Sequence, residues 1–241
     1  MIESKHAAAP NVDSGEVEKF TSRAADWWDP HGPFRTLHEI NPLRLGYVRG
    51  RVVLRGARVL DVGCGGGLFA EAVAAEGGEV VGIDMGPSNV GVARTHASES
   101  GFAIRYECID AAAFAAQRPG EFDVVTCFEL LEHVPDPAAI VSACALALRP
   151  GGSAFFSTIN RNPKSFLLAI VAAEHLLRMV PRGTHEYLKL VRPSELAAWC
   201  RRAGLNVVDL SGLHFNPVFA EYALGGNVDV NYFAHAVKGA R

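Results

Sequence analysis

The residues Asp61–Gly67, DVGCGGG, bring one carboxylate and several glycines together directly after a short apolar run. An Ala-rich stretch follows, so the pattern predicts a strand that turns on glycines into a helix. The first turn of such a helix has unpaired backbone N–H groups and attracts anions, as in many nucleotide sites. The carboxylate of Asp61 would repel a pyrophosphate placed there. These residues therefore favour a ligand that carries both a negative and a positive group.

Two common nucleotide-binding loops do not fit this stretch. The dinucleotide fingerprint Gly-x-Gly-x-x-Gly ends on Leu68 when it is counted from Gly63, and on Ala70 when it is counted from Gly65. A phosphate loop of the form GxxxxGK[ST] is absent from the sequence. An NAD-dependent dehydrogenase and a P-loop NTPase are therefore disfavoured.

S-adenosylmethionine fits better, because its methionine part is a zwitterion. We expect the backbone N–H groups of the glycine loop, with Gly63 and Gly65 at its centre, to bind the carboxylate, and Asp61 to attract the ammonium. Asp84 ends the β-rich run EVVGID and is placed to accept hydrogen bonds from the ribose hydroxyls. Asp110 ends AIRYECID, and we expect it to accept a hydrogen bond from the adenine amino group.

A second set of candidate residues lies in ELLEHV, where Glu129, Glu132 and His133 would share one face of a helical turn. Two chemistries are open for them. His133, with Glu132 beside it, could act as a general base. Alternatively, all three residues could hold Mg²⁺, which would lower the pKa of a bound hydroxyl. A third alternative is that the segment only shapes a pocket.

The elements that must position these residues alternate along the chain. Apolar and β-rich runs predict strands at 59–62, 79–84, 103–110, 122–129, 153–160, 206–215 and 230–238. Helical segments separate most of them, and one helix is expected to be capped by Ser88. Strands that alternate with helices predict right-handed crossovers and a mostly parallel sheet. The fold class is therefore α/β, with helices on both faces of the sheet.

Composition and charge describe an ordinary globular protein. A chain of 241 residues can form one large domain, here 13–241 after a flexible stretch at 1–12. Its net charge of −3 gives no electrostatic reason to expect a nucleic acid partner. Five scattered cysteines and the lack of a secretory signal predict a cytoplasmic protein.

Two further segments could cover a site. The stretch at about 161–192 is apolar and helix-forming with basic residues at its edges, so we expect a helical lid that also contacts an anionic membrane surface. The alternative is a helix packed on the sheet. Near the N-terminus, Phe20, Trp27 and Trp28 lie close to helical spacing, which indicates core packing first and a substrate lid second.

Several stretches of the sequence resemble a known family. VLDVGCGGG resembles motif I of the class I S-adenosylmethionine-dependent methyltransferases. INPLRLGYV, FDVVTCFELLEHVPDP, FFSTINRNPKS, RMVPRGTHEY and DVNYF together resemble the ubiquinone-biosynthesis O-methyltransferases. The resemblance extends from about Val12 to the final strand. It implies a Rossmann-like fold with a seven-stranded sheet, whose last strand is antiparallel.

The resemblance also implies an activity and site residues. The family methylates a hydroxyl of a polyprenyl catechol intermediate and later a hydroxyl of demethylubiquinol, so a polyprenylated phenol or quinol is the expected substrate. Other enzymes of ubiquinone biosynthesis and a peripheral membrane position are further expectations. Cofactor contacts carried over fall on Arg44, Gly63, Asp84 and Phe128, and eukaryotic relatives hold a metal at the matching glutamates and histidine. The alternative is a methyltransferase of the same fold that acts on another phenolic or a menaquinone-type substrate.

Overall fold

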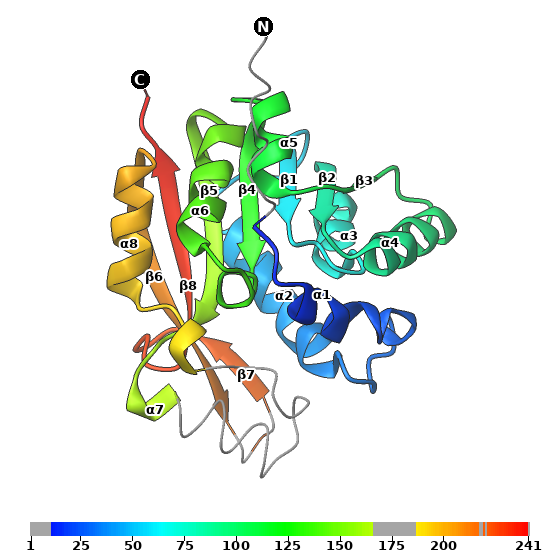
Figure 1. Cartoon of the computed structure of the whole chain (residues 1–241), viewed down its shortest axis with the longest axis horizontal. Coiled ribbons are helices and arrows are strands. Elements are labelled where there is room, and N and C mark those ends of the chain that lie inside the picture. The colour runs from blue at the N-terminus through cyan, green and yellow to red at the C-terminus, as the bar shows by residue number, and fades with distance from the viewer. Residues whose placement is uncertain (1–10, 166–186, 217–218, 220, 241) are drawn as a thin grey trace, which may run out of the picture.

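The structure, a computed structural model, describes residues 11–165, 187–216, 219 and 221–240. Within these residues one sheet of eight strands runs through the molecule in the order β3-β2-β1-β4-β5-β8-β6-β7 (Figure 1). The strands are β1 (Arg58–Val62), β2 (Glu79–Asp84), β3 (Arg105–Cys108), β4 (Phe122–Phe128), β5 (Leu148–Ile159), β6 (Leu205–Asn216), β7 (Glu221–Leu224) and β8 (Asn231–Lys238).

The sheet is mostly parallel, as the sequence predicts. β1 to β5 pair in parallel with one another, and β8 pairs antiparallel with both β5 and β6. The predicted number of seven strands is wrong by one, because β6 pairs antiparallel with an additional short strand, β7. The antiparallel last strand is confirmed as β8. The chain order reverses between β1 and β4, and ligands of open α/β sheets bind beside the carboxyl ends of strands at such a point.

Helices cover both faces of the sheet. The α-helices are α1 (Ser14–Thr21), α2 (Arg35–Arg49), α3 (Leu68–Ala75), α4 (Pro87–Glu99), α5 (Ala111–Gln117), α6 (Pro137–Ala147), α7 (Pro163–Ser165) and α8 (Pro193–Arg202). Short 3₁₀ helices are η1 (Ala24–Asp26), η2 (Leu131–His133) and η4 (Tyr187–Lys189). The predicted cap at Ser88 is wrong: Gly86 caps α4, because Pro87 suits the first helical position.

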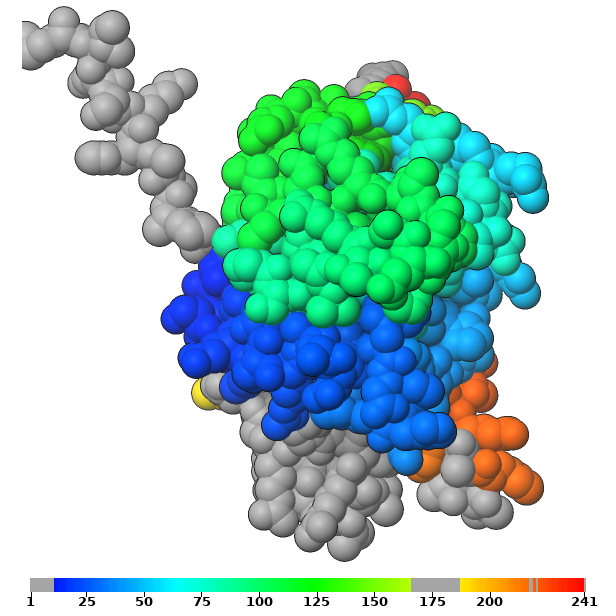
Figure 2. Space-filling view, turned by 90° about the vertical axis from the view of Figure 1, so that its right-hand side faces the viewer, coloured from blue at the N-terminus to red at the C-terminus, as the bar shows by residue number. Residues whose placement is uncertain are grey.

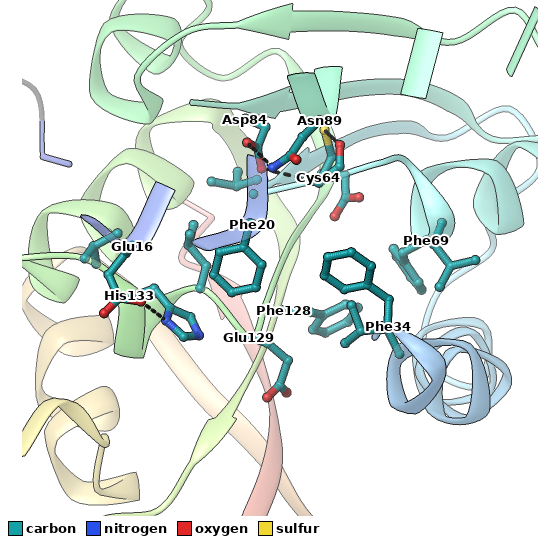
Figure 3. A pocket seen from close by; sticks show the side chains of 18 of the residues that line it. Glu16, Phe20, Phe34, Cys64, Phe69, Asp84, Asn89, Phe128, Glu129 and His133 are labelled. Atoms are coloured by element: carbon teal, nitrogen blue, oxygen red, sulfur yellow. Dashed lines mark hydrogen bonds and ion pairs between the residues drawn. The ribbon is translucent and has the colours of Figure 1, made fainter. Parts of the chain in front are cut away.

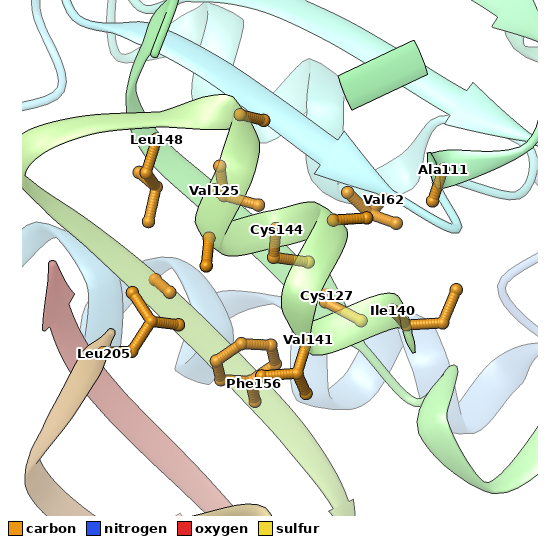
Figure 4. Packing of buried hydrophobic residues seen from close by; sticks show 14 of the residues in the cluster. Val62, Ala111, Val125, Cys127, Ile140, Val141, Cys144, Leu148, Phe156 and Leu205 are labelled. Carbon is orange, nitrogen blue, oxygen red and sulfur yellow. The ribbon is translucent and has the colours of Figure 1, made fainter. Parts of the chain in front are cut away.

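Two apolar clusters lie on opposite faces of the sheet, and β4 contributes to both. Val125 and Cys127 point to one cluster, while Val124 and Phe128 point to the other. This alternation follows from the two-residue period of a strand. Figure 4 shows Val125 and Cys127 beneath helix α6. The near-continuous apolar run of β4 is therefore explained by burial on both faces.

The N-terminal elements lie at the carboxyl ends of the parallel strands. Helices α1 and α2 sit beyond the tip of β4 in Figure 1, and in Figure 2 the N-terminal residues form a continuous layer below the residues coloured green. Asn11 exchanges hydrogen bonds of 2.6 and 2.8 Å with the backbone of Asp136. The stretch 1–12, predicted to be flexible, is therefore anchored at Asn11, and residues 1–10 lie outside the described part.

The predicted insertion at 161–192 falls largely outside the described residues, which end at 165 and resume at 187. Its flanks are α7 and η4. Among the described helices, none combines the length and apolar character needed to cross a bilayer.

Candidate active site

A cavity of about 760 Å³ opens at the carboxyl ends of β1, β2 and β4. Most of the predicted site residues line it, from five separate parts of the chain: Arg44, Asp61, Gly63, Gly65, Asp84, Asp110, Phe128, Glu129 and His133. Glu132 is the one predicted residue that does not line it. Figure 3 shows the side chains of Asp84, Phe128, Glu129 and His133 around this space.

The glycine loop has the backbone that its sequence requires. Gly63 and Gly65 have φ of 74° and 54°, a left-handed conformation that favours glycine. A Cβ atom on Gly65 would lie 2.1 Å from the ring of Trp27, so the buried indole packs directly on this loop. The adjacent Trp28 donates a hydrogen bond of 3.0 Å from its indole N–H to the carbonyl of Gly66. The N-terminal aromatic residues thus cover the glycine loop.

Most amides of this loop already have partners within the protein. The N–H groups of Gly63 and Cys64 donate to the carbonyl of Ile83 at 2.8 and 3.0 Å, and that of Gly65 donates to Asp84 at 3.0 Å. The N–H of Gly67 donates to the carbonyl of Cys64 at 2.9 Å. These four amides therefore do not support the predicted role of binding a carboxylate.

Arg44, on helix α2, brings hydrogen-bond donors without partners to the same cavity. Its side chain is buried, with the residue 5% exposed, and its Nε and Nη2 have no hydrogen-bond partner. The nearest carboxylate oxygen belongs to Glu129, at 3.9 Å from Nη2. Burial lowers the pKa of this guanidinium, and the negative charges of Glu129 and Asp61 oppose that effect. A buried cation with unused donors is the chemistry expected of an anion-binding residue.

Asp61 is the penultimate residue of β1 and lines the same cavity. One of its carboxylate oxygens accepts a hydrogen bond of 2.7 Å from the hydroxyl of Thr126 on β4. Burial raises the pKa of Asp61 to about 6, while the hydroxyl of Thr126 and the charge of Arg44 lower it. A bound cation would compensate this burial.

Two further acidic residues lie where the sequence places them, with different local roles. Asp84 accepts hydrogen bonds from the backbone N–H groups of Gly65 and Gly86 and from the amide of Asn89, and burial raises its pKa. Asp110 caps helix α5 by accepting from two backbone N–H groups at 2.9 and 3.1 Å. Asp110 follows β3 by two residues and has a structural role in addition to its place at the cavity.

Phe128 forms an apolar wall of the cavity. Its ring meets that of Phe69 edge-on, with centroids 4.9 Å apart, and the guanidinium of Arg44 lies 5.5 Å from its centroid. The aromatic surface therefore lies next to the candidate anion site, as the carried-over cofactor contacts imply.

The expectation of one helical face in ELLEHV is wrong. Glu129 has φ of 50°, a left-handed conformation, so the chain cannot continue from it as a helix. Its carboxylate accepts a hydrogen bond of 2.6 Å from the hydroxyl of Ser157. Only residues 131–133 form a short 3₁₀ turn. The side chains of Glu129, Glu132 and His133 consequently have three different partners.

The side chains of Glu132 and His133 lie in different environments. Glu132 is fully buried and accepts a hydrogen bond of 2.8 Å from the hydroxyl of Thr158. Burial, and then the charge of Glu129, raise its pKa to about 8. His133 donates from Nδ1 to Glu16 on helix α1 at 3.0 Å. Among the described residues, no group of three or more His, Cys, Asp or Glu side chains is arranged to hold a metal ion. The Mg²⁺ prediction is therefore not supported.

Glu16 is a site residue that the sequence analysis missed. It lines the cavity and is buried although it lies on a short helix near the N-terminus. Its partner His133 follows 117 residues later, so no local pattern in the sequence could reveal the contact.

Comparisons with known proteins agree with the fold. A family described as "Methyltransferase domain" matches residues 49–210. The ubiquinone biosynthesis O-methyltransferase of Hahella chejuensis is 55% identical over 228 residues, which cover 95% of this chain and 96% of that protein. The protein of the same name from Aromatoleum aromaticum is 54% identical over 94% of this chain and 97% of its own length.

Solved structures resemble the chain in fold. A magnesium protoporphyrin IX methyltransferase from Synechocystis with bound SAH has a TM-score of 0.68 at 19% identity, and the match covers 94% of this chain and all of that chain. A putative methyltransferase from Bacillus halodurans has a TM-score of 0.61 at 19% identity, over 81% of this chain and 98% of its own. With the high identity to the curated relatives, these matches confirm the resemblance seen in the sequence. The chain belongs to the ubiquinone biosynthesis O-methyltransferases, a family of S-adenosylmethionine-dependent enzymes with the class I methyltransferase fold.

Proposed function

We propose that this protein transfers a methyl group from S-adenosylmethionine to a hydroxyl of a polyprenylated catechol, and likewise to a hydroxyl of demethylubiquinol. The family membership supports the reaction. The observation that carries the site assignment is the buried guanidinium of Arg44, with two nitrogens that lack hydrogen-bond partners, in the same cavity as the carboxylate of Asp61. A cation and an anion that line one cavity suit the two charges of an amino-acid zwitterion.

The cofactor supplies a methyl group that is already activated by the positive charge on its sulfur. Arg44 binds the carboxylate of its methionine part, and Asp61 binds the ammonium. Asp84, at the end of β2, accepts from the ribose hydroxyls, with its orientation held by the N–H groups of Gly65 and Gly86. The ring of Phe128 provides an apolar surface for the adenosine. Asp110 stays a candidate for the adenine amino group.

The substrate hydroxyl must lose its proton, because a phenol has a pKa of about 10. His133 is the candidate base, since it lines the cavity and its Nδ1 is held by Glu16. In the neutral ring Nδ1 then carries the hydrogen, and Nε2 is the nitrogen that can accept a proton. Glu132, which does not line the cavity, accepts a hydrogen bond from the hydroxyl of Thr158, and its raised pKa keeps its carboxyl protonated at neutral pH.

The other part of the cavity is apolar and suits a prenylated ring. Its lining there includes Phe34, Leu37, Ile40, Leu213 and Phe215. Leu37 and Ile40 belong to α2, Phe34 is its N-cap residue, and Leu213 and Phe215 belong to β6. These side chains therefore line the side of the cavity near the β6–β7 hairpin. A ring with an isoprenoid tail would bury apolar surface here, which is favourable by about 25 cal/mol per Å².

The binding assignment is tested by calorimetry with S-adenosylhomocysteine. Arg44→Gln removes the buried charge, whereas Arg49→Gln removes an exposed charge on the same helix and serves as the matched control. We expect Arg44→Gln to lose at least about 10-fold in affinity, because a charge-assisted hydrogen bond is worth about 1.5–3 kcal/mol. Wild-type affinity in Arg44→Gln, with the fold intact by circular dichroism, would refute the assignment.

We also propose a peripheral position at an anionic membrane surface, where the polyprenyl substrate would be reached. The support is the sequence of the 161–192 segment, whose central part lies outside the described residues. Association with other enzymes of ubiquinone biosynthesis stays a prediction from the family resemblance. Flotation with anionic liposomes tests the membrane proposal, and equal flotation of a variant that lacks residues 166–186 would refute the role of this segment.

A further inference from the structure

The strand β8 begins with a polar side chain at the cavity. Asn231 is the first residue of β8, lines the cavity and is half-buried. Its neighbours across the sheet are Ile159 on β5 and Leu213 on β6, which also line the cavity. Residues directly opposite one another in antiparallel strands lie on the same face of the sheet. Asn231 therefore lies between two apolar residues in the part of the cavity that suits a prenylated ring.

The amide of Asn231 differs from the nearby polar side chains because it has no partner. Three other polar side chains reach the cavity from α7, β6 and β7, and each has a partner within the protein: Lys164 with Asp229, His214 with the carbonyl of Gly225, and Tyr222 with Thr36. The side chain of Asn231 makes no hydrogen bond to any residue in the described part of the chain. An amide that leaves water without gaining a partner costs free energy, and asparagine is uncommon in strands. A ligand at this position would compensate that cost.

Two other asparagines hold the backbone that leads into β8. The backbone N–H of Asn160 donates to the carbonyl of the residue just before Asn231, at 2.6 Å. The side-chain amide of Asn162 donates to the carbonyl of the residue before that one, at 2.5 Å. These two asparagines belong to the stretch FFSTINRNPKS and Asn231 belongs to DVNYF, so two stretches that are far apart in the sequence contact each other here. Their hydrogen bonds fix the point at which β8 begins, and with it the position of Asn231 at the cavity.

The sheet order separates Asn231 from the residues proposed for the cofactor. Asp61 and Phe128 belong to β1 and β4, and β8 lies two strands beyond β4 (Figure 1). Adjacent strands are about 4.8 Å apart, so β8 lies about 10 Å from the strand that carries Phe128. Because β8 is antiparallel to β5, its first residue lies at the same edge of the sheet as the carboxyl ends of the parallel strands. Asn231 is therefore on the substrate side of the proposed cofactor site.

We propose that Asn231 is a specificity residue for the substrate, which it orients by a hydrogen bond to the ring oxygen next to the hydroxyl that receives the methyl group. This inference rests on the proposed function, because it requires a catechol or a demethylubiquinol in the cavity. In a catechol the neighbouring oxygen is a hydroxyl, which donates to the amide oxygen. In demethylubiquinol it is a methoxy oxygen, which accepts from the amide N–H. An amide has both groups, so one side chain serves both substrates by turning over.

A purely structural role for Asn231 makes a different prediction. If its side chain only shapes the start of β8, then its loss would lower the rate with every substrate by the same factor. If it binds the neighbouring oxygen, then only substrates that carry this oxygen are affected. The two roles are separated by comparing substrates with and without the oxygen.

The experiment measures kcat/KM for three prenylated substrates: a catechol, a 2-methoxyphenol and a phenol with a single hydroxyl. Each is tested with wild type, with Asn231→Leu and, as the matched control, with Asn206→Leu, which changes an exposed asparagine of β6 that does not line the cavity. Leucine is similar in size to asparagine and has no hydrogen-bonding groups. The intrinsic reactivity of each substrate is the same with every variant, so a changed ratio of kcat/KM values reports the side chain.

We expect wild type to prefer the catechol and the 2-methoxyphenol over the phenol by at least about 10-fold, since a site that binds a substrate oxygen discriminates against the analogue that lacks it. Asn231→Leu should lower both ratios by at least about 10-fold, while its kcat/KM for the phenol stays within about 3-fold of wild type. Its affinity for S-adenosylhomocysteine should stay within about 2-fold of wild type, because Asn231 lies outside the proposed cofactor site. Asn206→Leu should equal wild type in every measurement.

A second variant, Asn231→Ala, removes the same amide with a smaller side chain and should show the same loss of preference, so the test does not depend on whether leucine fits. Wild-type ratios in these variants, or an equal loss of rate with all three substrates, would overturn the inference. If wild type methylates all three substrates equally well, the inference fails while the proposed function stands. If wild type methylates none of them, the proposed function fails and the inference falls with it.

Discussion

At the scale of residues, the site depends on charges that are held away from water. Arg44 and Asp61 are both buried at the cavity, and each has a pKa shifted by burial. Such groups are unfavourable in an empty site and favourable once an oppositely charged group binds. Their burial therefore supports the proposal that the two charges bind the zwitterion of the cofactor.

The raised pKa of Asp61 gives a pH dependence to cofactor binding. Its pKa is about 6, so below that pH its carboxyl becomes neutral and no longer attracts an ammonium group. We expect the affinity for S-adenosylhomocysteine to fall about 10-fold between about pH 7.5 and pH 5, since one pKa unit corresponds to about 1.4 kcal/mol. Asp61→Asn should bind weakly at both pH values. An equally steep pH dependence in this variant, measured by calorimetry, would contradict the assignment.

Glu132 gives a pH dependence to stability. Its folded-state pKa of about 8 lies above the ordinary value, so the folded state retains a proton that the unfolded state releases. Its contribution to stability is therefore fully present below about pH 4.5 and is lost as the pH rises towards about 8. Glu132→Gln removes this titration.

The measurement is urea unfolding of wild type, Glu132→Gln and, as a control, the exposed Glu99→Gln. Relative to wild type, the free energy of unfolding of Glu132→Gln should rise by about 2–3 kcal/mol between about pH 5.5 and pH 8. A difference that stays constant with pH would show that Glu132 is ionised in the folded protein. Glu99→Gln should follow the wild-type curve.

At the scale of elements, the N-terminal helices and the glycine loop form one unit. The ring of Trp27 packs on Gly65, and Trp28 donates to the carbonyl of Gly66. The positive φ of Gly65 and the closeness of the indole leave no room for a side chain. The loop thus depends on an element that lies almost 40 residues earlier in the chain.

Gly65→Ala tests this contact. We expect it to lower the free energy of unfolding by at least about 2 kcal/mol, because a left-handed alanine alone costs about 1–2 kcal/mol and the Trp27 ring must also move. Gly46→Ala is the matched control, since Gly46 lies inside α2 and an added Cβ there meets nothing within 4 Å. It should be neutral or stabilising by up to about 1 kcal/mol. Equal stability of the two variants in thermal unfolding would contradict the packing of Trp27 on the loop.

The elements differ in how far the sequence could predict them. β4 was predictable because both of its faces are buried, so its residues are almost all apolar. β7 was not, because it has only four residues and pairs only with the end of β6. The helical turn predicted for ELLEHV was wrong for another reason. The left-handed backbone of Glu129 interrupts the turn, and this backbone conformation depends on tertiary contacts such as the hydrogen bond from Ser157.

The site residues also differ in how far the sequence could predict them. Asp61 and Asp84 follow from a general rule, since the carboxyl ends of parallel strands meet at one edge of the sheet. Arg44 came only from the family resemblance, and its buried guanidinium supports that assignment. Glu16 could not be predicted, because its burial depends on contacts with His133 and Lys189, which are far away in the sequence.

At the scale of the whole molecule, the fold brings three separate parts of the chain to one cavity. The parallel strands supply the cofactor-facing carboxylates, the N-terminal helices supply Arg44 and Glu16, and the C-terminal strand β6 supplies apolar side chains. Arg44, Glu16 and the end of β6 lie outside the family match at residues 49–210, so the parts outside the match contribute both to the proposed cofactor site and to the proposed substrate site. Substrate preference should therefore follow the N-terminal and C-terminal elements.

The most direct test of the account is methyl transfer by the purified protein, followed by mass spectrometry of the product. With S-adenosylmethionine present, we expect a demethylubiquinol analogue and a prenylated catechol to be methylated on oxygen. Their kcat/KM should exceed that of a menaquinone-type quinol by at least about 10-fold, or about 1.4 kcal/mol. A protein that binds S-adenosylhomocysteine but methylates only the menaquinone-type ring would contradict the substrate assignment, and one that methylates none of them would contradict the central claim.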